Sequence, residues 1–466
     1  MQLLGALQMI QHEMLLFAAF WFIVGALDEF AVDICYLWLR HTGRLREVRI
    51  GRDDEVRPLA HRTALFVPSW QESPVIAQMI AHTCKAWSQD DLTIYVGCYR
   101  NDAPTIEAAM RSAARDRRVR LVMLDRDGPT TKADCLNRIY AAMCDDEDRS
   151  GHRYESIVFH DAEDMVHPAA LSVIDAGLMH HDFVQLPVRP EPQLASRWIA
   201  GHYADEFAEA HGKTLAVRSS LGAAIPAAGV GCGFSRERLG ELAARRSLAG
   251  SDGPFARECL TEDYELGLTF SQAEGGSTFL RARDAYGEPV ATRAFFPARL
   301  RDAVRQKTRW IHGIAFQGWD RMGWSGGPVD IWMALRDRRG PLTAIVLAVA
   351  YLLLLIEAVL GIARLTGWQD VYELSDPVRT MIAISFGAFV WRSLWRFAFT
   401  ANAYGLGEGL RAVLRIPIAN VISIMAGRRA FWAYARTLRG GEPLWDKTAH
   451  DAHPATDAPP RAVEVA

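Results

Sequence analysis

The sequence predicts an α/β domain inserted between membrane-spanning helices. Between residues 63 and 188, short apolar segments rich in β-branched and aromatic residues alternate with longer amphipathic segments, which is the pattern of strands followed by helices. Long apolar stretches lie on both sides of this region, and they are long enough to cross a bilayer. Alternating strands and helices are typical of a mostly parallel sheet that helices cover on both faces.

Composition narrows the classes of function. Half of the residues are apolar and the net charge is −3, so the chain lacks the clustered basic surface that binding to nucleic acid requires. The seven cysteines are scattered, without a C-x-x-C pair. This spacing favours reduced thiols in a cytoplasmic domain over a disulfide framework or a zinc site.

The first membrane helix is predicted at about residues 14–39, where the chain is nearly apolar. Four arginines follow it directly, at positions 40, 44, 46 and 49. By the positive-inside rule, the N-terminus is then periplasmic and the chain after residue 40 is cytoplasmic. No basic stretch precedes the apolar segment, so we do not expect a cleaved signal peptide. Residues 1–50 form this helix and a basic linker.

The central domain is predicted over residues 51–320. Its strands are expected at residues 63–67, 92–98, 120–124, 156–160 and 183–188. The helices between them are expected at residues 75–87, 104–115, 132–144 and 168–180, with further helices at 199–220, 261–272 and 297–313. The glycine-rich residues 229–233 are expected to form a turn.

Two more membrane helices are predicted at about residues 341–363 and 377–400, within a region that spans 321–440. Arginines precede the first and follow the second, so the central domain and the C-terminus both face the cytoplasm. Residues 416–425 are too short to cross, and with the arginine- and aromatic-rich residues 428–439 they predict helices on the inner leaflet. The tail at 441–466 is expected to be disordered after about residue 450, where proline, alanine and acids dominate.

Charged residues interrupt two of these membrane helices. Asp28, Glu29 and Asp33 lie in the cytoplasmic half of the first, and Arg392 and Arg396 lie one turn apart in the cytoplasmic half of the third. Because intramembrane charges usually face a partner or a water-filled cavity, we expect these acids and arginines to pair and to lock the two helices together. In the alternative, each side chain extends to the membrane surface.

A cluster of acids after the fourth predicted strand is the first candidate functional site. Asp161, Glu163 and Asp164 follow that strand directly, and ligands of open α/β sheets bind at the carboxyl ends of strands. Oxygen ligands suit Mg²⁺ or Mn²⁺, and such an ion holds a phosphate-bearing substrate. The alternative is a solvated acidic turn, in which Asp164 caps the helix that begins after Pro168.

Further motifs occur where strands end or helices begin. Pro68 and Glu72 follow the first strand, Asp102 follows the second, and Lys132 opens a helix whose N-terminus suits a phosphate group. Later in the chain come two more motifs, Thr261-Glu262-Asp263 at a helix start and Gln306-x-x-Arg309-Trp310 just before the membrane. Each motif also has a plain explanation, as a helix cap or as an amphipathic face near the membrane.

The order and spacing of these motifs resemble the family-2 glycosyltransferases of the GT-A fold over about residues 60–315. With the flanking membrane helices and the tail motif at residues 445–450, the chain most resembles the bacterial membrane glycosyltransferases of the phage-adsorption-protein-B type. Larger members of this type carry a nucleotide-sensing domain after the membrane helices, so regulation of this chain is expected to involve another protein.

The resemblance implies a Rossmann-like GT-A domain between the membrane helices and a role for each motif. The residues implied for the nucleotide sugar are Pro68, Glu72, Asp102, Lys132, Asp161, Gln306 and Arg309. Asp161, with Glu163 or Asp164, is implied to hold Mg²⁺ or Mn²⁺, and Glu262 and Asp263 form the catalytic motif. On the acceptor side, Trp310 stacks on a sugar, while Gly231 and Gly233 let the backbone approach closely.

The chemistry of glycosyl transfer is consistent with these roles. Negative charge develops on the departing diphosphate, and a divalent cation together with Lys132 and Arg309 would stabilise that charge. The acceptor hydroxyl needs a base on the opposite face of the sugar, for which we choose Asp263, so that one displacement inverts the anomeric centre. Because a helix N-terminus lowers the pKa of an aspartate, we expect a weak base and a late, concerted proton transfer.

These observations predict an inverting glycosyltransferase of the bacterial inner membrane. It would use a nucleotide sugar, with UDP as the expected nucleotide, to build a surface or exported polysaccharide. The alternatives are transfer of one sugar to a lipid-phosphate carrier, or a catalytically silent scaffold or receptor component. The expected partners are the sugar donor, a glycan or lipid-linked acceptor and membrane lipids. Three spans are too few to enclose a polymer channel, so a second copy or an export or regulatory protein is also expected.

Overall fold

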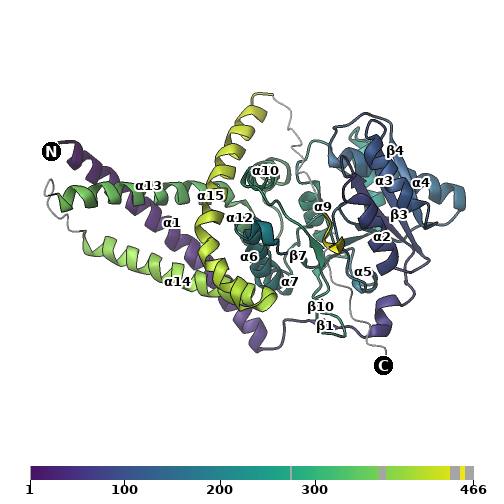
Figure 1. Cartoon of the computed structure of the whole chain (residues 1–466), viewed down its shortest axis with the longest axis horizontal. Coiled ribbons are helices and arrows are strands. Elements are labelled where there is room, and N and C mark those ends of the chain that lie inside the picture. Colours follow the sequence, from purple (N-terminus) through teal and green to yellow (C-terminus); the bar gives the residue numbers. More distant parts are fainter. Residues whose placement is uncertain (1, 273–274, 367–373, 441–451, 457–466) are drawn as a thin grey trace.

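The computed structural model describes residues 2–272, 275–366, 374–440 and 452–456. Figure 1 shows the long helices α1 (Gln2–His41), α13 (Gly340–Leu365) and α14 (Asp376–Tyr404) side by side at one end of an elongated molecule and an α/β domain at the other end. A fourth long helix runs across the direction of these three and lies between them and the domain. The chain therefore has the predicted arrangement, in which helical ends of the sequence flank a central α/β domain.

The domain is built on a seven-stranded sheet. Its strands lie in the order β4 (Val119–Leu124), β3 (Leu92–Tyr99), β2 (Thr63–Ser69), β5 (Ser156–Phe159), β8 (Cys232–Ser235), β6 (Phe183–Gln185) and β9 (Ser277–Phe279). Neighbouring strands are parallel except at β8, which runs antiparallel to β5 and to β6. Two further parallel pairs are β1 (Val48–Arg49) with β10 (Ala282–Arg283), and β7 (Val188–Pro190) with β11 (Thr292–Ala294).

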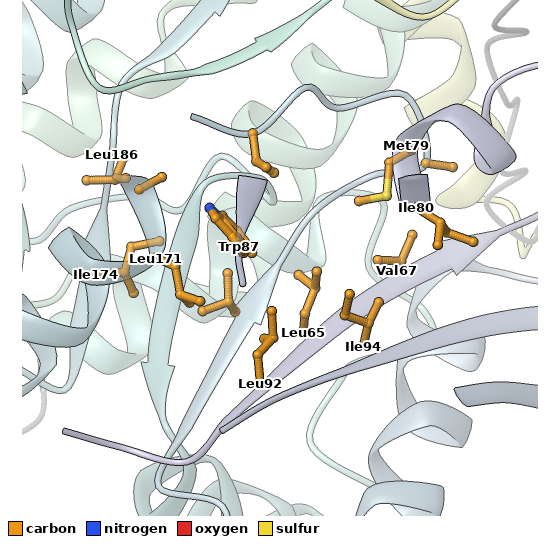
Figure 2. Close-up of a cluster of buried hydrophobic side chains, with 14 of the residues drawn as sticks. Leu65, Val67, Met79, Ile80, Trp87, Leu92, Ile94, Leu171, Ile174 and Leu186 are labelled. Carbon is orange, nitrogen blue, oxygen red and sulfur yellow. The ribbon is translucent and has the colours of Figure 1, made fainter. Parts of the chain in front are cut away.

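Helices cover both faces of the sheet, because successive side chains along a strand point to opposite sides. Leu65 and Val67 of β2 face a core that includes side chains of α2 (Ile76–Ala86), α3 (Ala103–Ala113) and α5 (Ala170–Leu178). Figure 2 shows this core, with Trp87 among the aliphatic side chains. Ala64 and Phe66 face the other core, with α4 (Lys132–Ser150), α8 (Arg236–Leu248) and α9 (Glu262–Ser271).

The predicted α/β fold is confirmed, and the predicted turn at residues 229–233 is wrong in its second half. Cys232 and Gly233 begin β8, a central strand of the sheet. Glycine fits at position 233 because a Cβ there would collide with Ile174 of α5. A run of glycines that looks like a turn in the sequence thus marks a place where a helix packs closely on the sheet.

Two helical segments of the domain that contain π-helical turns pack against the long helices. The first runs through α6 (Gly201–Glu209), a π-helical turn (Ala210–Thr214) and α7 (Leu215–Ser220), where one helix is predicted. The second runs through α10 (Leu300–Ile311), a π-helical turn (His312–Gln317) and α11 (Gly318–Met322). Helix α12 (Pro328–Arg338) then leads into the membrane helices. Turns of this kind are rare and frequently occur at functional sites.

The long helices are α1 (Gln2–His41), α13 (Gly340–Leu365), α14 (Asp376–Tyr404) and α15 (Leu406–Thr437). Within the described residues, three are long and apolar enough to cross a membrane, namely α1 from Ala6, α13 and α15. The predicted third span at residues 377–400 forms α14, but α14 is not among these three. Its arginines, which include Arg392 and Arg396, lower its hydropathy.

The region after residue 405 also differs from its prediction. We expected helix on the inner leaflet, with an apolar stretch at residues 416–425 that is too short to cross a membrane. Instead, α15 is one helix of 32 residues that continues through Pro417. Its length and composition suffice for crossing. Its direction, however, is across α1, α13 and α14 (Figure 1), which is the orientation expected of a helix at a membrane surface if those three helices span it.

Part of the tail is ordered, which corrects the prediction of disorder after about residue 450. Pro454–Thr456 forms a short 3₁₀ turn, and His453 and Pro454 are buried. The tail motif at residues 445–450 lies outside the described residues.

The predicted pairing between α1 and α14 is confirmed for one pair. Glu29 lies 2.6 Å from Arg392, and Arg392 also lies 2.8 Å from Glu209 of α6. The prediction is wrong for Arg396, whose ion-pair partner is Glu209 at 3.8 Å. The α/β domain therefore supplies one of the acids that the arginines of α14 require.

Asp28 and Asp33 form their ion pairs outside α14, although Asp33 also accepts a hydrogen bond of 2.8 Å from Nε1 of Trp391 in α14. Asp28 pairs with Arg336 and Arg339, at the end of α12. Asp33 receives a hydrogen bond of 2.5 Å from Lys213, which is fully buried and also lies 2.9 Å from Glu209. The charges thus tie α1 to α12, to α14 and to the π-helical turn of the domain, rather than tying two membrane helices to each other alone.

Replacing Lys213 tests this link. Lys213→Met leaves the carboxylates of Asp33 and Glu209 buried without their ammonium partner, so we expect a loss of about 3–5 kcal/mol in the free energy of unfolding. The double variant Lys213→Met/Asp33→Asn also removes the charge of Asp33, which no longer has its ammonium partner, and should recover part of the lost stability. Thermal and denaturant unfolding in detergent measure both, with the exposed Lys85→Met as a control. An equal stability of the Lys213 and Lys85 variants would contradict the link.

Candidate active site

A cavity of about 430 Å³ opens beside the carboxyl ends of β2 and β5, where α4, α9 and α10 converge. All predicted site residues line it except Asp102, Gly231 and Gly233. Those that line it are Pro68, Glu72, Lys132, Asp161, Glu163, Asp164, Glu262, Asp263, Gln306, Arg309 and Trp310. Pro68 and Trp310, 242 positions apart in the sequence, therefore line one site. Such a site is expected at the carboxyl ends of neighbouring parallel strands.

Lys132 supplies positive charge at the centre of the acids. It is the first residue of α4, and its ammonium lies 2.7 Å from a carboxylate oxygen of Asp161. Asp161, Glu262 and Asp263 together hold the pKa of Lys132 above its usual range, although burial opposes this. Lys132 is therefore charged, and it offsets part of the repulsion among these three carboxylates.

The loop between β5 and α5, residues 160–169, carries Asp161, Glu163 and Asp164 and is called the acid loop below. Asp164 plays a structural part within it. Its carboxylate accepts hydrogen bonds from the backbone N–H of Asp161 at 2.9 Å and from Nδ1 of His160 at 2.8 Å, and its side chain is 2% exposed. The plain alternative of a helix cap is wrong, because Ala169 occupies the N-cap position of α5. The Asp164 carboxylate instead fixes the backbone that carries Asp161.

The loop presents the carboxylates of Asp161 and Glu163 to the cavity as possible ligands of a divalent cation, while the Asp164 carboxylate holds the Asp161 backbone. Within the described residues, no three His, Cys, Asp or Glu side chains gather as a ready metal cage. This donor set fits Mg²⁺ or Mn²⁺, because such ions are commonly held by one or two carboxylates together with substrate phosphates and water.

Glu262 and Asp263 open α9 and face the cavity. Burial raises the pKa of both carboxyl groups, and the neighbouring Asp263 contributes to raising the pKa of Glu262 to about 7. The expectation that the helix N-terminus lowers the pKa of Asp263 is therefore wrong, because loss of water outweighs the helix dipole. A raised pKa makes Asp263 a stronger base than a solvated aspartate.

Gly229 has no side chain and therefore leaves space for the carboxylate of Asp263. Its φ of +74° is in the left-handed region, and a Cβ at this position would collide with the carboxylate of Asp263. The predicted glycines behave differently. A Cβ at Gly231 would collide with the hydroxyl of Thr292, and Gly233 packs against α5 as described above, so neither lines the cavity.

On the side of the first two strands, Trp70 and Tyr99 line the cavity with Pro68 and Glu72. The rings of Trp70 and Tyr99 meet edge to face at 4.9 Å. Asp102 lies behind them and caps α3, where its carboxylate accepts from the backbone N–H of Gln71 at 2.5 Å. The plain explanation is correct for Asp102, whose bond to Gln71 also fixes the loop that carries Glu72.

The opposite wall is aromatic and adjoins the long helices. Trp310 is half-buried against Tyr203 and Phe207 of α6, with ring centroids 6.0 and 6.4 Å away. Helices α6, α10 and α15 share the apolar cluster beneath it. The Lys307 ammonium lies 5.9 Å from the centroid of the Trp310 ring, a cation–π distance. The Gln-x-x-Arg-Trp motif thus lies where the domain meets the membrane helices.

Sequence reasoning missed several residues of this wall, including Phe207, His211, Phe296 and Asp337. His211 accepts a hydrogen bond of 2.8 Å at Nδ1 from the backbone N–H of Val188, and burial lowers its pKa to about 3, so the ring is neutral. The predicted helix at residues 199–220 hinted only at Phe207 and His211, and the π-helical turn that carries His211 has no sequence signature.

This fold, with an acid loop and a carboxylate pair that line one cavity, is that of the glycosyltransferases of the GT-A fold. Residues 61–313 match the model of the family described as "Glycosyltransferase like family 2", and the chain belongs to this family. The predicted family and fold class are confirmed.

Two curated relatives match most of the chain. Bacteriophage adsorption protein B of Escherichia coli (strain K12) and bacteriophage N4 adsorption protein B of Escherichia coli O157:H7 are each 33% identical over 461 residues. The matches cover 92% of this chain and 60% of each relative. The chain therefore spans about 60% of the length of the curated relatives it matches.

A solved structure has a similar fold. The mannosyltransferase from Pyrobaculum calidifontis, determined in complex with GDP-Man and Mn²⁺, matches with a TM-score of 0.53 at 16% sequence identity. The match covers 90% of this chain and 99% of that protein. At this level of identity the similarity concerns the fold.

Glu262→Gln tests the environment of the carboxylate pair. The pKa of Glu262 is about 7 in the folded chain and 4.5 without the surrounding protein, so the folded state binds a proton more tightly between these values. The wild-type protein then loses stability as the pH rises from 4.5 to 7. Glutamine mimics the protonated acid and escapes this loss.

We therefore expect Glu262→Gln to be more stable than the wild type at pH 8, with a difference that shrinks toward pH 5. Unfolding in detergent across this range measures the difference, and the exposed Glu107→Gln serves as the control. A difference in stability that does not change with pH would contradict a raised pKa.

Proposed function

We propose that the protein is an inverting glycosyltransferase that transfers a sugar from a nucleotide sugar to a glycan acceptor at the bacterial inner membrane. The observation that carries the proposal is the single cavity shared by Asp161, Lys132 and the Glu262–Asp263 pair. Its two walls differ in chemistry, which matches the two substrates of a transfer reaction. Carboxylates and a lysine suit a diphosphate with its cation, and an aromatic wall suits the apolar face of a sugar.

The donor is proposed to lie along the strand ends. Trp70 and Tyr99 offer an aromatic surface for the base, and Glu72 offers a carboxylate beside them. Lys132 would then contact the diphosphate, since it stands at the N-terminus of α4, where backbone N–H groups also favour negative charge. Asp102 supports this part of the site through its bond to Gln71 and does not itself line the cavity.

Asp161 and Glu163 are proposed to hold Mg²⁺ or Mn²⁺, with the diphosphate oxygens and water as the other ligands. When bound there, the ion supplies positive charge to the departing diphosphate. Lys132 beside the acid loop and Arg309 on α10 add fixed positive charge to the cavity. Asp164 is assigned a supporting role, because its carboxylate holds the Asp161 backbone.

Asp263 is proposed to accept the proton of the acceptor hydroxyl as that oxygen attacks the anomeric carbon. The bond to the diphosphate breaks at the opposite face, so the configuration inverts in one displacement. The raised pKa of Asp263 favours this proton transfer. Glu262, which is also protonated more readily than a solvated glutamate, would limit the negative charge beside Asp263.

Trp310 is proposed to stack on the terminal sugar of the acceptor, and Gln306 to contact the bound substrate. The position of this wall beside α15 is consistent with an acceptor that remains close to the membrane.

We further propose that the α/β domain is cytoplasmic and the N-terminus periplasmic, with UDP as the nucleotide and a surface or exported polysaccharide as the product. A second copy or partner proteins would complete an export path.

A donor screen tests the proposal. Full-length protein in detergent is incubated with Mn²⁺ or Mg²⁺ and a panel of UDP- and GDP-sugars, and the release of nucleoside diphosphate is measured. We expect release from one donor, reduced about 10²–10⁴-fold in Asp263→Asn because the general base is lost. The Kd for the nucleotide should change less than about threefold, and Glu107→Gln should match the wild type.

The products decide among the alternatives. Long labelled chains support polymerisation, and one labelled sugar on a lipid phosphate supports single transfer. If no donor is consumed, and Asp263→Asn restores the phenotype of a deletion strain as well as the wild type does, the protein is a scaffold and the proposal fails.

Two substitutions in the acid loop test the assignment of metal ligands. Glu163→Gln should weaken Mn²⁺ binding about tenfold or more, because a carboxylate ligand is lost. Asp164→Asn keeps an oxygen that can accept from the Asp161 N–H, so Mn²⁺ binding should stay within a few fold of the wild type. Calorimetric titration of Mn²⁺ in the presence of UDP measures both. Weaker binding in Asp164→Asn than in Glu163→Gln would reverse the assignment.

A further inference from the structure

The acid loop is held from behind by three ring N–H groups. Nε1 of Trp87 donates to the carbonyl of His167 at 3.0 Å, and Nε2 of His82 lies 2.9 Å from the carbonyl of Val166. The third ring is His453, whose Nε2 lies 3.0 Å from the carbonyl of Asp164. A carbonyl oxygen only accepts, so both histidines must carry a hydrogen on Nε2.

His453 comes from the C-terminal tail, 289 residues after the carbonyl that it contacts. Figure 1 shows its short segment, Ala452 to Thr456, against the α/β domain near α2. The His453 side chain is 1% exposed and its ring centroid lies 6.2 Å from that of His82. Pro454 is buried as well.

The segment also fixes the His453 ring. The backbone N–H of Ala455 donates to Nδ1 of His453 at 3.1 Å, which leaves the hydrogen of the neutral ring on Nε2. The hydroxyl and backbone N–H of Thr456 donate to the carbonyl of His453 at 2.6 and 3.1 Å. The turn thus presents one N–H group in a set direction, toward Asp164.

Asp164 links this contact to the cavity. Its carbonyl receives the His453 N–H, while its carboxylate receives the N–H of Asp161. Asp161 in turn pairs with Lys132 in the cavity. The acid loop therefore has one surface toward the substrates and another covered by α2 and the tail.

We propose that His453 is a positioning residue of the donor site, and that the tail segment completes this site by fixing the acid loop. The proposal rests on the proposed function, because it assigns the loop to the metal and the nucleotide. His453 does not touch the substrates; it acts through the Asp164 backbone. The groups behind a metal ligand commonly change metal affinity by about 10–100-fold when they are removed.

The test compares three variants of the full-length protein in detergent. His453→Ala removes the donor, His453→Gln keeps a side-chain N–H that can reach the carbonyl, and His152→Ala removes an exposed histidine elsewhere. The first measurement is the Mn²⁺ affinity in the presence of UDP. The second is hydrogen exchange of the backbone amides at residues 160–169, which reports on the loop without any ligand.

We expect His453→Ala to weaken Mn²⁺ binding about tenfold and to speed exchange in the loop but not in the strands β2 and β3. His453→Gln should return both values to within about threefold of the wild type, and His152→Ala should leave them unchanged. Unchanged affinity and exchange in His453→Ala would overturn the proposal. So would a His453→Gln variant as impaired as the alanine variant, since packing and not the N–H group would then hold the loop.

The two proposals fail in different ways. If the wild-type protein bound neither Mn²⁺ nor UDP, the proposed function would fail. The exchange measurement would then still decide whether His453 fixes the acid loop, because it needs neither ligand.

Discussion

The ion pair between Lys132 and Asp161 is the contact on which the site depends. Four parts of the chain bring carboxylates to one cavity, namely Glu72, the acid loop, the Glu262–Asp263 pair and Asp337. Like charges with little water between them repel one another. The Lys132 ammonium lies among them, 2.7 Å from Asp161, and its charge is favoured by Glu262 and Asp263 as well. Lys132 begins α4, Asp161 follows β5, and Glu262 and Asp263 begin α9, so one half-buried charge relates three elements to one another. Without it, the acids would have to separate or take up protons.

Much of this could be predicted from the sequence. The strands β2 to β5 and the helices between them follow from apolar periodicity, and the acids at strand ends follow from the geometry of a parallel sheet. The antiparallel strand β8 could not be predicted, because the glycines at 229, 231 and 233 look like a turn in the sequence. Gly233 instead allows α5 to pack closely on β8. The pKa of Asp263 depends on burial by distant residues, which no local pattern reveals. The partners of Arg396 and Asp33 lie on the π-helical segment of the domain, and the tail contact of His453 spans 289 positions.

The long helices and the site are parts of one packed structure. The cluster beneath Trp310 contains residues of α6, α10 and α15, and the charges of α1 reach α12 and the π-helical turn after α6. Tyr264, next to the proposed base, donates to Asp337 of α12 at 2.9 Å, one position from Arg336. A shift of α1 along its axis would therefore strain contacts on both sides of the cavity. The α/β domain therefore packs directly against the long helices and is not merely joined to them along the chain.

The π-helical turn at Ala210–Thr214 places two residues of one turn in different surroundings. His211 lines the cavity, while Lys213, two positions later, is bonded to Asp33 of α1. A regular α-helix has 3.6 residues in each turn, and the wider turn changes the direction of every side chain that follows. Deleting one residue here would restore an ordinary helix and rotate α7 away from its contacts. The function of this segment thus depends on its length, because one residue more or fewer would turn Lys213 away from Asp33 or His211 away from the cavity.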